Sequence, residues 1–244
     1  MEFDEAPSPN RRPRPAGAAI AMLVLHYTGM PTAEEALARL RDAEAGVSSH
    51  YLVEEDGRIR RLVPEGLRAA HAGQSFWRGR AALNDVSIGI EVVNPGHDWG
   101  YRAFPALQMG AVAELCLDIL RRHPGITAGN VVGHSDVAPD RKRDPGERFD
   151  WEGLAREGIG LWPEGVPGLA SDMPEAAEGE ARGALSRIGY RTDVPLPLLL
   201  AAFQRHWRPE RVDGRADLGT LRRLSAVARL VEAAAPEAGL GARG

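Results

Sequence analysis

AIAMLVLHYT (residues 19–28) is a short apolar run with β-forming residues near its end, and this pattern predicts a buried strand. A second run, VSIGIEVVN (86–94), predicts another strand, which ends in an Asn-Pro-Gly turn. Between the two runs, Asp56-Gly57 stands between alternating segments and predicts a β-hairpin. A shorter strand is expected around NVVGH (130–134). Because the hairpin must be antiparallel, the sheet should be mixed.

Helical periodicity occurs between these strands. Thr32 followed by Glu35 resembles a capping box, and apolar residues at helical spacing extend the expected helix over 32–44. The same spacing predicts a helix over 105–122, with arginines in its last turn, where cations suit the helix dipole. Strands interleaved with helices predict an α/β fold with a mixed central β-sheet flanked by helices.

Changes in composition divide the chain into four expected parts. Residues 163–180 are rich in Pro, Gly, Ala and Glu and are typical of a linker. Three short helical patterns follow, at 181–188, 195–206 and 217–233. The expected parts are an extended N-terminal arm (1–18), an α/β domain (19–162), the linker (163–180) and a small C-terminal three-helix domain (181–244).

Composition excludes several classes of protein. With 43% hydrophobic and 26% charged residues, the 244-residue chain is typical of a soluble globular protein. Its net charge of −4 argues against a nucleic-acid partner. No apolar run is long enough for a membrane span. The single cysteine, Cys116, lies in an apolar helical stretch and is expected in the core, so no disulfide or thiolate metal site can form within the chain.

The N-terminus, MEFDEAPSPNRRPRPAG, lacks the basic start and apolar stretch of a secretory signal. We therefore expect a cytoplasmic protein, with the periplasm or cell envelope as the alternative if a leader has been removed. We also expect a monomer.

Two histidines stand at the ends of predicted strands, and one carboxylate follows the second. They are His26 in LVLHYT, His134 in VVGHSDVAP, and Asp144 in the loop DRKRDPG. A catalytic zinc site has three protein ligands of the histidine and carboxylate type and leaves a fourth position open. The three residues match that set of ligands, although each histidine alone also suits a hydrogen-bonded structural role.

Two further residues stand out by context. Glu91 interrupts an otherwise apolar strand, so it either faces solvent or lies in a cleft with a raised pKa, as a general base needs. Lys142 is the only lysine in a chain that has 30 lysines and arginines in total, and it lies two residues before Asp144. A site that must contact one oxygen closely favours the compact lysine ammonium over the wide guanidinium of arginine.

Five segments together, in order and over roughly residues 8–162, resemble the zinc-dependent N-acetylmuramoyl-L-alanine amidases of the AmpD/AmiD type. They are LVLHYTGM, SSHYLVEEDGRIRRLVPEG, AAHAGQSFWRG, LNDVSIGIEVVN and VVGHSDVAPDRKRDPGERFDW. The resemblance implies that His26, His134 and Asp144 bind Zn²⁺, that Glu91 is the catalytic carboxylate, and that Lys142 is the active-site lysine. The implied reaction is hydrolysis of the bond between N-acetylmuramic acid and L-alanine in peptidoglycan or muropeptides. Glu91 would take the proton of the attacking water, and zinc and Lys142 would stabilise the oxyanion.

The segment LPLLLAAFQRHWRPERVDGRADLGTLRRL resembles a peptidoglycan-binding three-helix domain. A domain of this kind on a flexible linker would hold the polymer near the catalytic domain. We therefore expect truncation after Pro163 to weaken binding to sacculi and to leave cleavage of small muropeptides nearly unchanged.

Other residues receive weaker assignments. The resemblance places five of them near the substrate: His50, His71, Trp77, Arg78 and Asn84. The two histidines among them suit a scaffold role equally well. Asp136 is expected to cap or orient the loop after His134, and Trp207 is expected in the core. His97, His123 and His206 are interpreted as surface or helix-end residues.

Two other functions remain as alternatives. Some relatives of this fold recognise peptidoglycan without cleaving it, but such modules typically lack one or more of the zinc ligands. A zinc peptidase acting on ordinary polypeptides is disfavoured because no HExxH motif is present.

Overall fold

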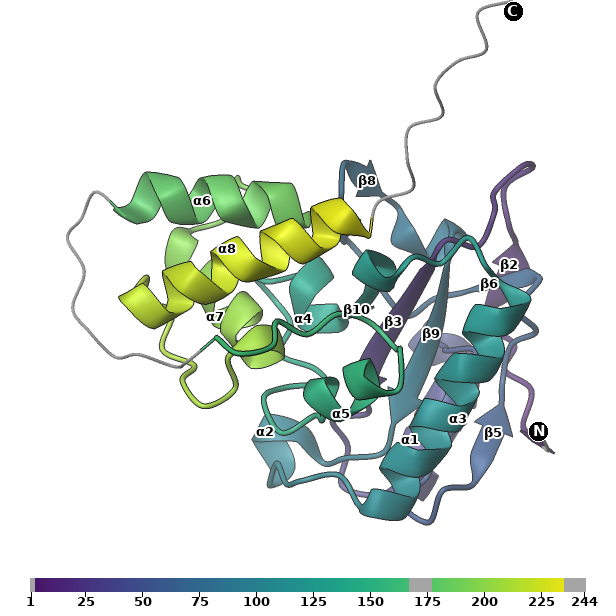
Figure 1. Cartoon of the computed structure of the whole chain (residues 1–244). Helices are drawn as coiled ribbons and strands as arrows, with labels where there is room; N and C mark the ends of the chain where they lie inside the picture. The colour runs from purple at the N-terminus through teal and green to yellow at the C-terminus, as the bar shows by residue number, and fades with distance from the viewer. Residues whose placement is uncertain (1–2, 167–176, 235–244) are drawn as a thin grey trace, which may run out of the picture.

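The computed structural model of the chain describes residues 3–166 and 177–234 (Figure 1). Its central sheet has six strands, in the spatial order β1 (Asp4–Glu5), β5 (Ile59–Arg61), β4 (Tyr51–Val53), β9 (Ser87–Val92), β3 (Met22–Tyr27) and β10 (Val131–Gly133). Strands β4, β9, β3 and β10 are parallel, whereas β5 is antiparallel to β4. The predictions of a mixed sheet and an α/β fold are therefore confirmed.

The hairpin between β4 and β5 turns where the sequence predicted it. Glu54 N donates to Arg58 O at 2.8 Å, and Asp56 Oδ1 accepts from Arg58 N at 3.0 Å. Gly57 has a φ of 87°, a conformation that glycine adopts without strain. Two small ribbons complete the β structure: β2 (Arg11–Pro13) pairs with β6 (Leu67–Ala69), and β7 (Phe76–Trp77) with β8 (Arg80–Ala81).

One face of the sheet is covered by the long helix α3 (Ala106–Arg122). Its buried residues, which include Val112, Leu115 and Ile119, share a hydrophobic cluster with Leu23 and Ile90 of the sheet. Because strand side chains alternate between faces, residues 22, 24 and 26 of β3 face the other way. The sheet therefore has a second face, to which His26 belongs.

Helix α1 (Ala33–Arg41) begins where the capping pattern predicted. Thr32 Oγ1 accepts from Glu35 N at 3.2 Å, and Leu40 packs against Leu52 of β4. The remaining short elements are η1 (Ala43–Ala45), η2 (Leu83–Asp85), α2 (Gly96–Trp99), η3 (Ala128–Asn130), α4 (His134–Val137) and α5 (Trp151–Arg156).

Helices α6 (Ala177–Ile188), α7 (Leu196–Trp207) and α8 (Leu218–Ala233) form a helical unit on the second face of the sheet (Figure 1). Sheet residues Met22, Val24 and Val132 belong to one continuous hydrophobic cluster with residues of all three helices, such as Phe203 and Val227. The three predicted helices are thus present. They share the core of the α/β part, however, and this differs from the expectation of a unit that only a linker connects. Most of the predicted linker, 167–176, lies outside the described residues.

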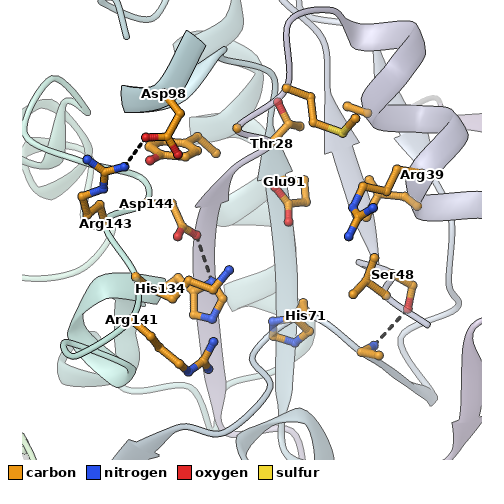
Figure 2. Close-up of a pocket in the computed structure, with 18 residues that line it drawn as sticks. Thr28, Arg39, Ser48, His71, Glu91, Asp98, His134, Arg141, Arg143 and Asp144 are labelled. Carbon is orange, nitrogen blue, oxygen red and sulfur yellow. Dashed lines mark hydrogen bonds and ion pairs between the residues drawn. The ribbon is translucent and has the colours of Figure 1, made fainter. Parts of the chain in front are cut away.

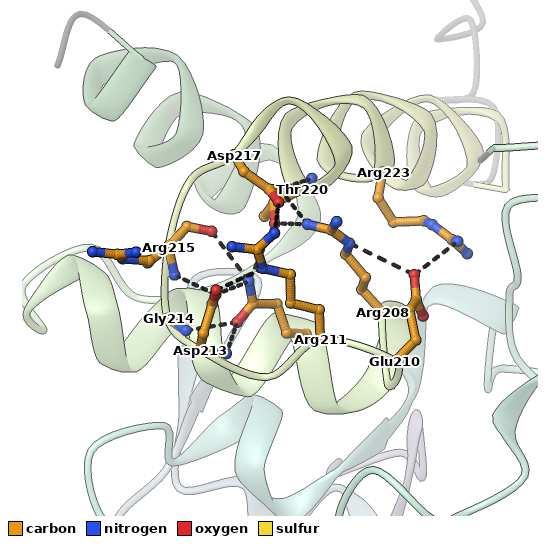
Figure 3. Close-up of polar contacts among 10 residues, drawn as sticks. Arg208, Glu210, Arg211, Asp213, Gly214, Arg215, Asp217, Thr220 and Arg223 are labelled. Carbon is orange, nitrogen blue, oxygen red and sulfur yellow. Dashed lines mark hydrogen bonds and ion pairs between the residues drawn. The ribbon is translucent and has the colours of Figure 1, made fainter. Parts of the chain in front are cut away.

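A buried polar network fixes the loop between α7 and α8 (Figure 3). Arg208 Nη1 donates to Thr220 Oγ1 at 2.6 Å and also pairs with Asp217, and all three side chains are buried. Gln204 Oε1 accepts from the backbone N of Asp213 and Gly214 at 3.0 and 2.7 Å. This loop is therefore held by contacts within the helical unit itself.

The N-terminal arm is extended, as expected, but it packs along the α/β part. Ser8 Oγ donates to Leu40 O at 2.6 Å, and Asn10 Nδ2 donates to Val47 O at 2.8 Å. Arg14 reaches four backbone carbonyls, those of Glu65, Asn84, Asp85 and Ser87. The arm thus fastens β6 and the end of α1 to the sheet.

The structure bears on two expectations from composition, the burial of Cys116 and the question of a membrane-spanning helix. Cys116 is fully buried, and burial raises the pKa of its thiol to about 12, which suits a core residue. Among the described residues, no helix has both the length and the apolar character that crossing a bilayer requires.

Candidate active site

The site lies where the parallel strands end. In the register of β3 and β9, His26 stands directly opposite Glu91, so both side chains leave the same face of the sheet. Gly133, the last residue of β10, pairs with Leu25, which brings the following His134 level with His26. Ligand sites of open α/β sheets form at the carboxyl ends of strands, and this site follows that rule.

The three expected metal ligands meet at this edge. His26 Nδ1 lies 2.9 Å from His134 Nδ1 and 3.1 Å from Asp144 Oδ2, and His134 Nδ1 lies 2.9 Å from the same oxygen. All three residues are buried, with exposures of 5% or less. A zinc ion with bonds of about 2.0–2.1 Å sets tetrahedral ligand atoms roughly 3.3 Å apart. The triangle in this structure is close to that size.

Hydrogen bonds behind the site fix which nitrogen of His26 faces it. Ser87 Oγ–H donates to Leu83 O at 2.7 Å, so Ser87 Oγ accepts from His71 Nε2–H at 3.0 Å. His71 Nδ1 is then an acceptor, and His26 Nε2–H donates a hydrogen bond to it at 3.0 Å. The Nδ1 lone pair of His26 is left pointing into the site. This chain of donors assigns the tautomer from the hydrogen-bond pattern.

The second histidine is oriented in the same way. His134 Nε2–H donates to Ala72 O at 3.2 Å, which leaves its Nδ1 lone pair towards Asp144. Two imidazole lone pairs and a carboxylate oxygen thus converge with no donor between them. Three acceptors at hydrogen-bond distance repel one another unless a cation joins them, so the residues fit a metal ion.

Electrostatics supports this donor set. Burial and the neighbouring His134 lower the pKa of His26 to about 4, which keeps its imidazole neutral at neutral pH. Burial opposes ionisation of Asp144, but His134 and His26 outweigh it and hold the pKa of that carboxyl below its ordinary value. A neutral imidazole and an ionised carboxylate are the forms that bind metal.

Glu91 has the opposite electrostatic character. Burial and the nearby charge of Asp144 raise its pKa well above the ordinary value of 4.5. The charge of Lys142 offsets part of this rise. Its Oε2 atom is buried and has no hydrogen-bond partner among the described residues. A carboxyl with a raised pKa and a free oxygen at a cleft suits proton transfer.

A pocket of about 330 Å³ opens over these residues (Figure 2). Four cations line it: Arg39, Arg141, Lys142 and Arg143. Arg141 donates to the carbonyls of Ala72 and Gln74, and Arg143 pairs with Asp98. Within residues 3–166 and 177–234, the side chains of Arg39 and Lys142 make no hydrogen bond or ion pair. Figure 2 shows Arg39 reaching towards the pocket from the side opposite Asp144. No sequence pattern indicated Arg39, because arginines are common in this chain.

Three of the five expected substrate contacts belong to the hydrogen-bonded scaffold around the pocket. His71 does line the pocket, and its ring lies against Gly89, where an added Cβ would come within 2.5 Å of it. His50 is fully buried and accepts from Gly89 N at 3.0 Å through Nδ1. Asn84 is also buried, and its Oδ1 accepts from the backbone N of His71 and Ala72. His50 and Asn84 therefore hold the pocket wall without lining it.

Trp77 requires a correction, whereas the assignment of Arg78 stays a prediction. Trp77 is 1% exposed, donates from Nε1 to Gly129 O at 3.1 Å, and packs edge-on against Tyr190 of the helical unit. A buried indole cannot contact a substrate, so Trp77 is a core residue. Arg78 is exposed but lies beside the backbone of Gly189 and outside the pocket lining.

His97 and His206 lie at helix ends, as interpreted, in the last turns of α2 and α7, but neither is exposed. His206 is 2% exposed and pairs with Asp136 at 2.7 Å. His97 is partly buried and stacks on Tyr101, with hydrogen-bond contacts to Tyr27 and Glu147. Both histidines connect segments far apart in the sequence, which single-sequence patterns do not reveal.

Three of the weaker assignments are confirmed. His123 caps α3 and pairs with Glu65 at 2.7 Å. Trp207 lies in the core with 2% exposure. Asp136 Oδ2 accepts from Gly133 N at 2.7 Å and so caps the start of α4.

Comparison with known proteins decides the family. The family model described as N-acetylmuramoyl-L-alanine amidase matches residues 16–147. The chain belongs to the N-acetylmuramoyl-L-alanine amidase family. It is 38% identical over 233 residues to the N-acetylmuramoyl-L-alanine amidase AmiD of Escherichia coli K12. This match covers 86% of this chain and 83% of AmiD. The 1,6-anhydro-N-acetylmuramyl-L-alanine amidase AmpD of Haemophilus influenzae is 34% identical and covers 61% of this chain and 86% of its own.

Solved structures of the family resemble both parts of this chain. AmiD from E. coli, in complex with anhydro-N-acetylmuramic acid-L-Ala-D-γ-Glu-L-Lys, superposes with a TM-score of 0.78 at 37% identity. That match covers 90% of this chain and 93% of the AmiD chain. AmpDh3 from Pseudomonas aeruginosa superposes with a TM-score of 0.76 at 34% identity and covers 94% of this chain and 98% of its own. The helical unit is therefore a shared feature of these amidases.

Proposed function

We propose that this amidase uses zinc, held by His26, His134 and Asp144, to hydrolyse the amide between N-acetylmuramic acid and L-alanine in muropeptides. One observation carries the proposal. Two imidazole lone pairs and an ionised carboxylate converge within 3.1 Å beside a carboxyl whose pKa is raised. Zinc at this site would act as a Lewis acid on the scissile carbonyl and on the attacking water.

The protein's own residues account for the proton transfers. Glu91 takes a proton from the water as its oxygen bonds to the lactyl carbonyl carbon. Lys142, free of other partners among the described residues, donates towards the oxygen that gains negative charge. The protonated Glu91 then gives its proton to the alanine nitrogen as the carbon–nitrogen bond breaks. The products are a muramic carboxylic acid and a peptide with a free amine.

The charge of the pocket supports an anionic substrate. The peptide in the AmiD complex contains D-γ-Glu, and a residue linked through its γ-carboxyl carries a free α-carboxylate. Arg39 and Lys142 are cations without a counter-ion in the described part of the chain, and Arg39 lies at the rim, where it is exposed. We assign Arg39 to that carboxylate, because guanidinium groups bind carboxylates in a fixed geometry.

Product analysis tests the proposal directly. The protein is incubated with an anhydro-muramyl tripeptide and, separately, with purified sacculi, and products are identified by mass spectrometry. We expect stem peptide with a free L-alanine amine. A non-catalytic recognition module would bind the material and release nothing, whereas a peptidase would cut between amino acids and leave the muramic acid linked to alanine.

A further inference from the structure

Asp136 lies two residues after the ligand His134 in the short helix α4, and its side chain is completely buried. Its Oδ2 accepts from Gly133 N at 2.7 Å, which closes the turn that presents His134. In the same turn, Ser135 N donates to Asp144 O at 2.8 Å. A shift of α4 would therefore move two of the three metal ligands together.

The other two partners of Asp136 come from the helical unit. Tyr190, which follows α6, donates from its hydroxyl to Oδ1 at 2.6 Å. His206, in α7, contacts Oδ2 through Nδ1 at 2.7 Å. Both donors are 2% exposed and lie 54 and 70 residues away from Asp136 in the sequence.

Aromatic packing keeps these two donors in place. The His206 ring lies between Trp151, with centroids 3.8 Å apart, and Trp207, with centroids 3.6 Å apart. Tyr190 packs edge-on against Trp77 at 5.0 Å. A ring stacked on both faces has little rotational freedom, so the His206 imidazole stays aimed at Asp136, and the edge contact with Trp77 restricts Tyr190.

We propose that Tyr190 and His206 are positioning residues that hold His134 in its metal-binding geometry through Asp136. The helical unit is then a structural part of the metal site. This inference rests on the zinc site proposed above. It assigns the unit a role in metal binding that does not depend on contact with glycan.

Packing alone does not explain this arrangement. A carboxylate with no exposure is costly to bury unless its oxygens accept hydrogen bonds, and here all three donors converge on one carboxylate beside a metal ligand. The helical unit has a second buried network, Arg208 with Asp217 and Thr220, which stays within the unit. That second network offers a matched control, since its loss affects the unit and not the site.

Three variants separate the roles. Tyr190→Phe removes the hydroxyl donor and keeps the ring, and His206→Phe keeps a flat ring between the two tryptophans without the Nδ1 donor. Thr220→Val removes a buried hydroxyl of the control network. For each zinc-loaded full chain we would measure zinc affinity by chelator competition, the visible spectrum of the Co²⁺ form, the thermal midpoint, and kcat and KM on a soluble muropeptide.

We expect the double variant Tyr190→Phe/His206→Phe to bind zinc about 10- to 100-fold more weakly, the loss typical of outer-sphere partners. Its Co²⁺ spectrum should change, and kcat at saturating zinc should fall with KM little altered. Thr220→Val should lower the thermal midpoint comparably but keep wild-type zinc affinity. His206→Asn, which restores an N–H donor near the Nδ1 position, should recover most of the affinity lost in His206→Phe.

Two other outcomes are distinguishable. Wild-type zinc affinity and an unchanged Co²⁺ spectrum in the double variant would overturn this inference and leave the zinc amidase intact. Failure of the wild-type protein itself to bind zinc would overturn the proposed function and this inference together.

Discussion

At the scale of single residues, the proton-transfer role assigned to Glu91 follows from the surroundings of its side chain and not from the strand pattern. Its neighbours in β9 are apolar, its Oε2 has no hydrogen-bond partner in the part of the chain that the structure describes, and burial raises its pKa above 4.5. A base must be ionised to accept a proton, so kcat/KM should rise with pH through a midpoint above 4.5. Glu91→Gln should abolish turnover and retain zinc, because the carboxylate is not a ligand.

A pH–rate profile together with metal analysis of the variant checks this assignment. An acid limb at or below 4.5, or a zinc-loaded Glu91→Gln protein with near-normal turnover, would remove Glu91 from the proton transfers.

Arg39 carries a second prediction at this scale. Arg39→Gln should raise KM about fivefold for a muropeptide with a free α-carboxylate on D-γ-Glu, with kcat little changed, which is the size of effect expected of an exposed ion pair. Arg41→Gln on the same helix, whose guanidinium donates to Pro7 O outside the pocket, is the matched control. The difference between wild type and Arg39→Gln should vanish when the α-carboxylate is amidated. An equal rise in KM for both substrates would contradict the assignment.

The residue types of the site could be predicted from the sequence, but their orientations could not. His26, Glu91 and His134 lie at or next to strand ends, which are visible as breaks in apolar runs, and Asp144 lies in the polar loop ten residues after His134. Trp77 was placed in the groove by resemblance, yet its indole turns into the core. Resemblance to relatives predicts where a residue stands in a motif. The direction of its side chain depends on packing partners that are far away in the sequence.

At the scale of elements, Glu65 joins three segments. It accepts from Tyr51 Oη at 2.8 Å and pairs with Arg122 and with His123 at 2.7 Å, at the end of α3. Burial opposes its ionisation, but Arg122, His123 and Tyr51 outweigh it and lower the pKa of Glu65 below 4.5. Glu65→Gln should therefore reduce the free energy of unfolding by about 2 kcal/mol at pH 7.

The pH dependence of this loss follows from the direction of the shift. A carboxyl with a depressed folded-state pKa stabilises the protein above its unfolded pKa, and the contribution is lost as pH falls through the folded value. Urea unfolding at pH 7, 5 and 4 should show the difference between wild type and Glu65→Gln shrinking below about pH 4.5. Glu34→Gln, on the exposed first turn of α1, should change stability little at any of these pH values. A pH-independent difference would contradict this account.

Long periodic elements could be predicted from the sequence, and short ones could not. Helix α3 and strands β3 and β9 carry enough apolar residues to show a period. Strands β1, β7 and β8 have two residues each, too few for any period. Their pairing depends on the partner strand that lies beside them.

At the scale of the whole molecule, the shared core changes the expected effect of truncation. Removing the chain after Pro163 would expose Met22, Val24 and Val132 to water and leave Asp136 without Tyr190 and His206. We now expect the truncated chain to lose cooperative folding, and with it the cleavage of both soluble muropeptides and sacculi. Circular dichroism melting and the two cleavage assays check this. A truncated protein that folds and cleaves soluble muropeptide at the wild-type rate would contradict this expectation and would show that the helical unit is an independent domain.

The sequence indicated three C-terminal helices with apolar faces but not the surface that those faces cover. An amphipathic pattern shows that one face of a helix is buried, whereas the partner surface is set by the tertiary fold. The cytoplasmic location and the monomeric state stay predictions, and light scattering tests the second.

The measurement that tests the central claim most directly is cleavage of anhydro-muramyl-L-Ala-D-γ-Glu-L-Lys by one protein preparation before and after removal of its metal. We predict one zinc ion per chain, cleavage at the bond between the lactyl group and L-alanine, loss of cleavage in the metal-free protein, and its return when one equivalent of zinc is added. Undiminished cleavage by metal-free protein, or a zinc-loaded protein that leaves this bond intact, would contradict the account.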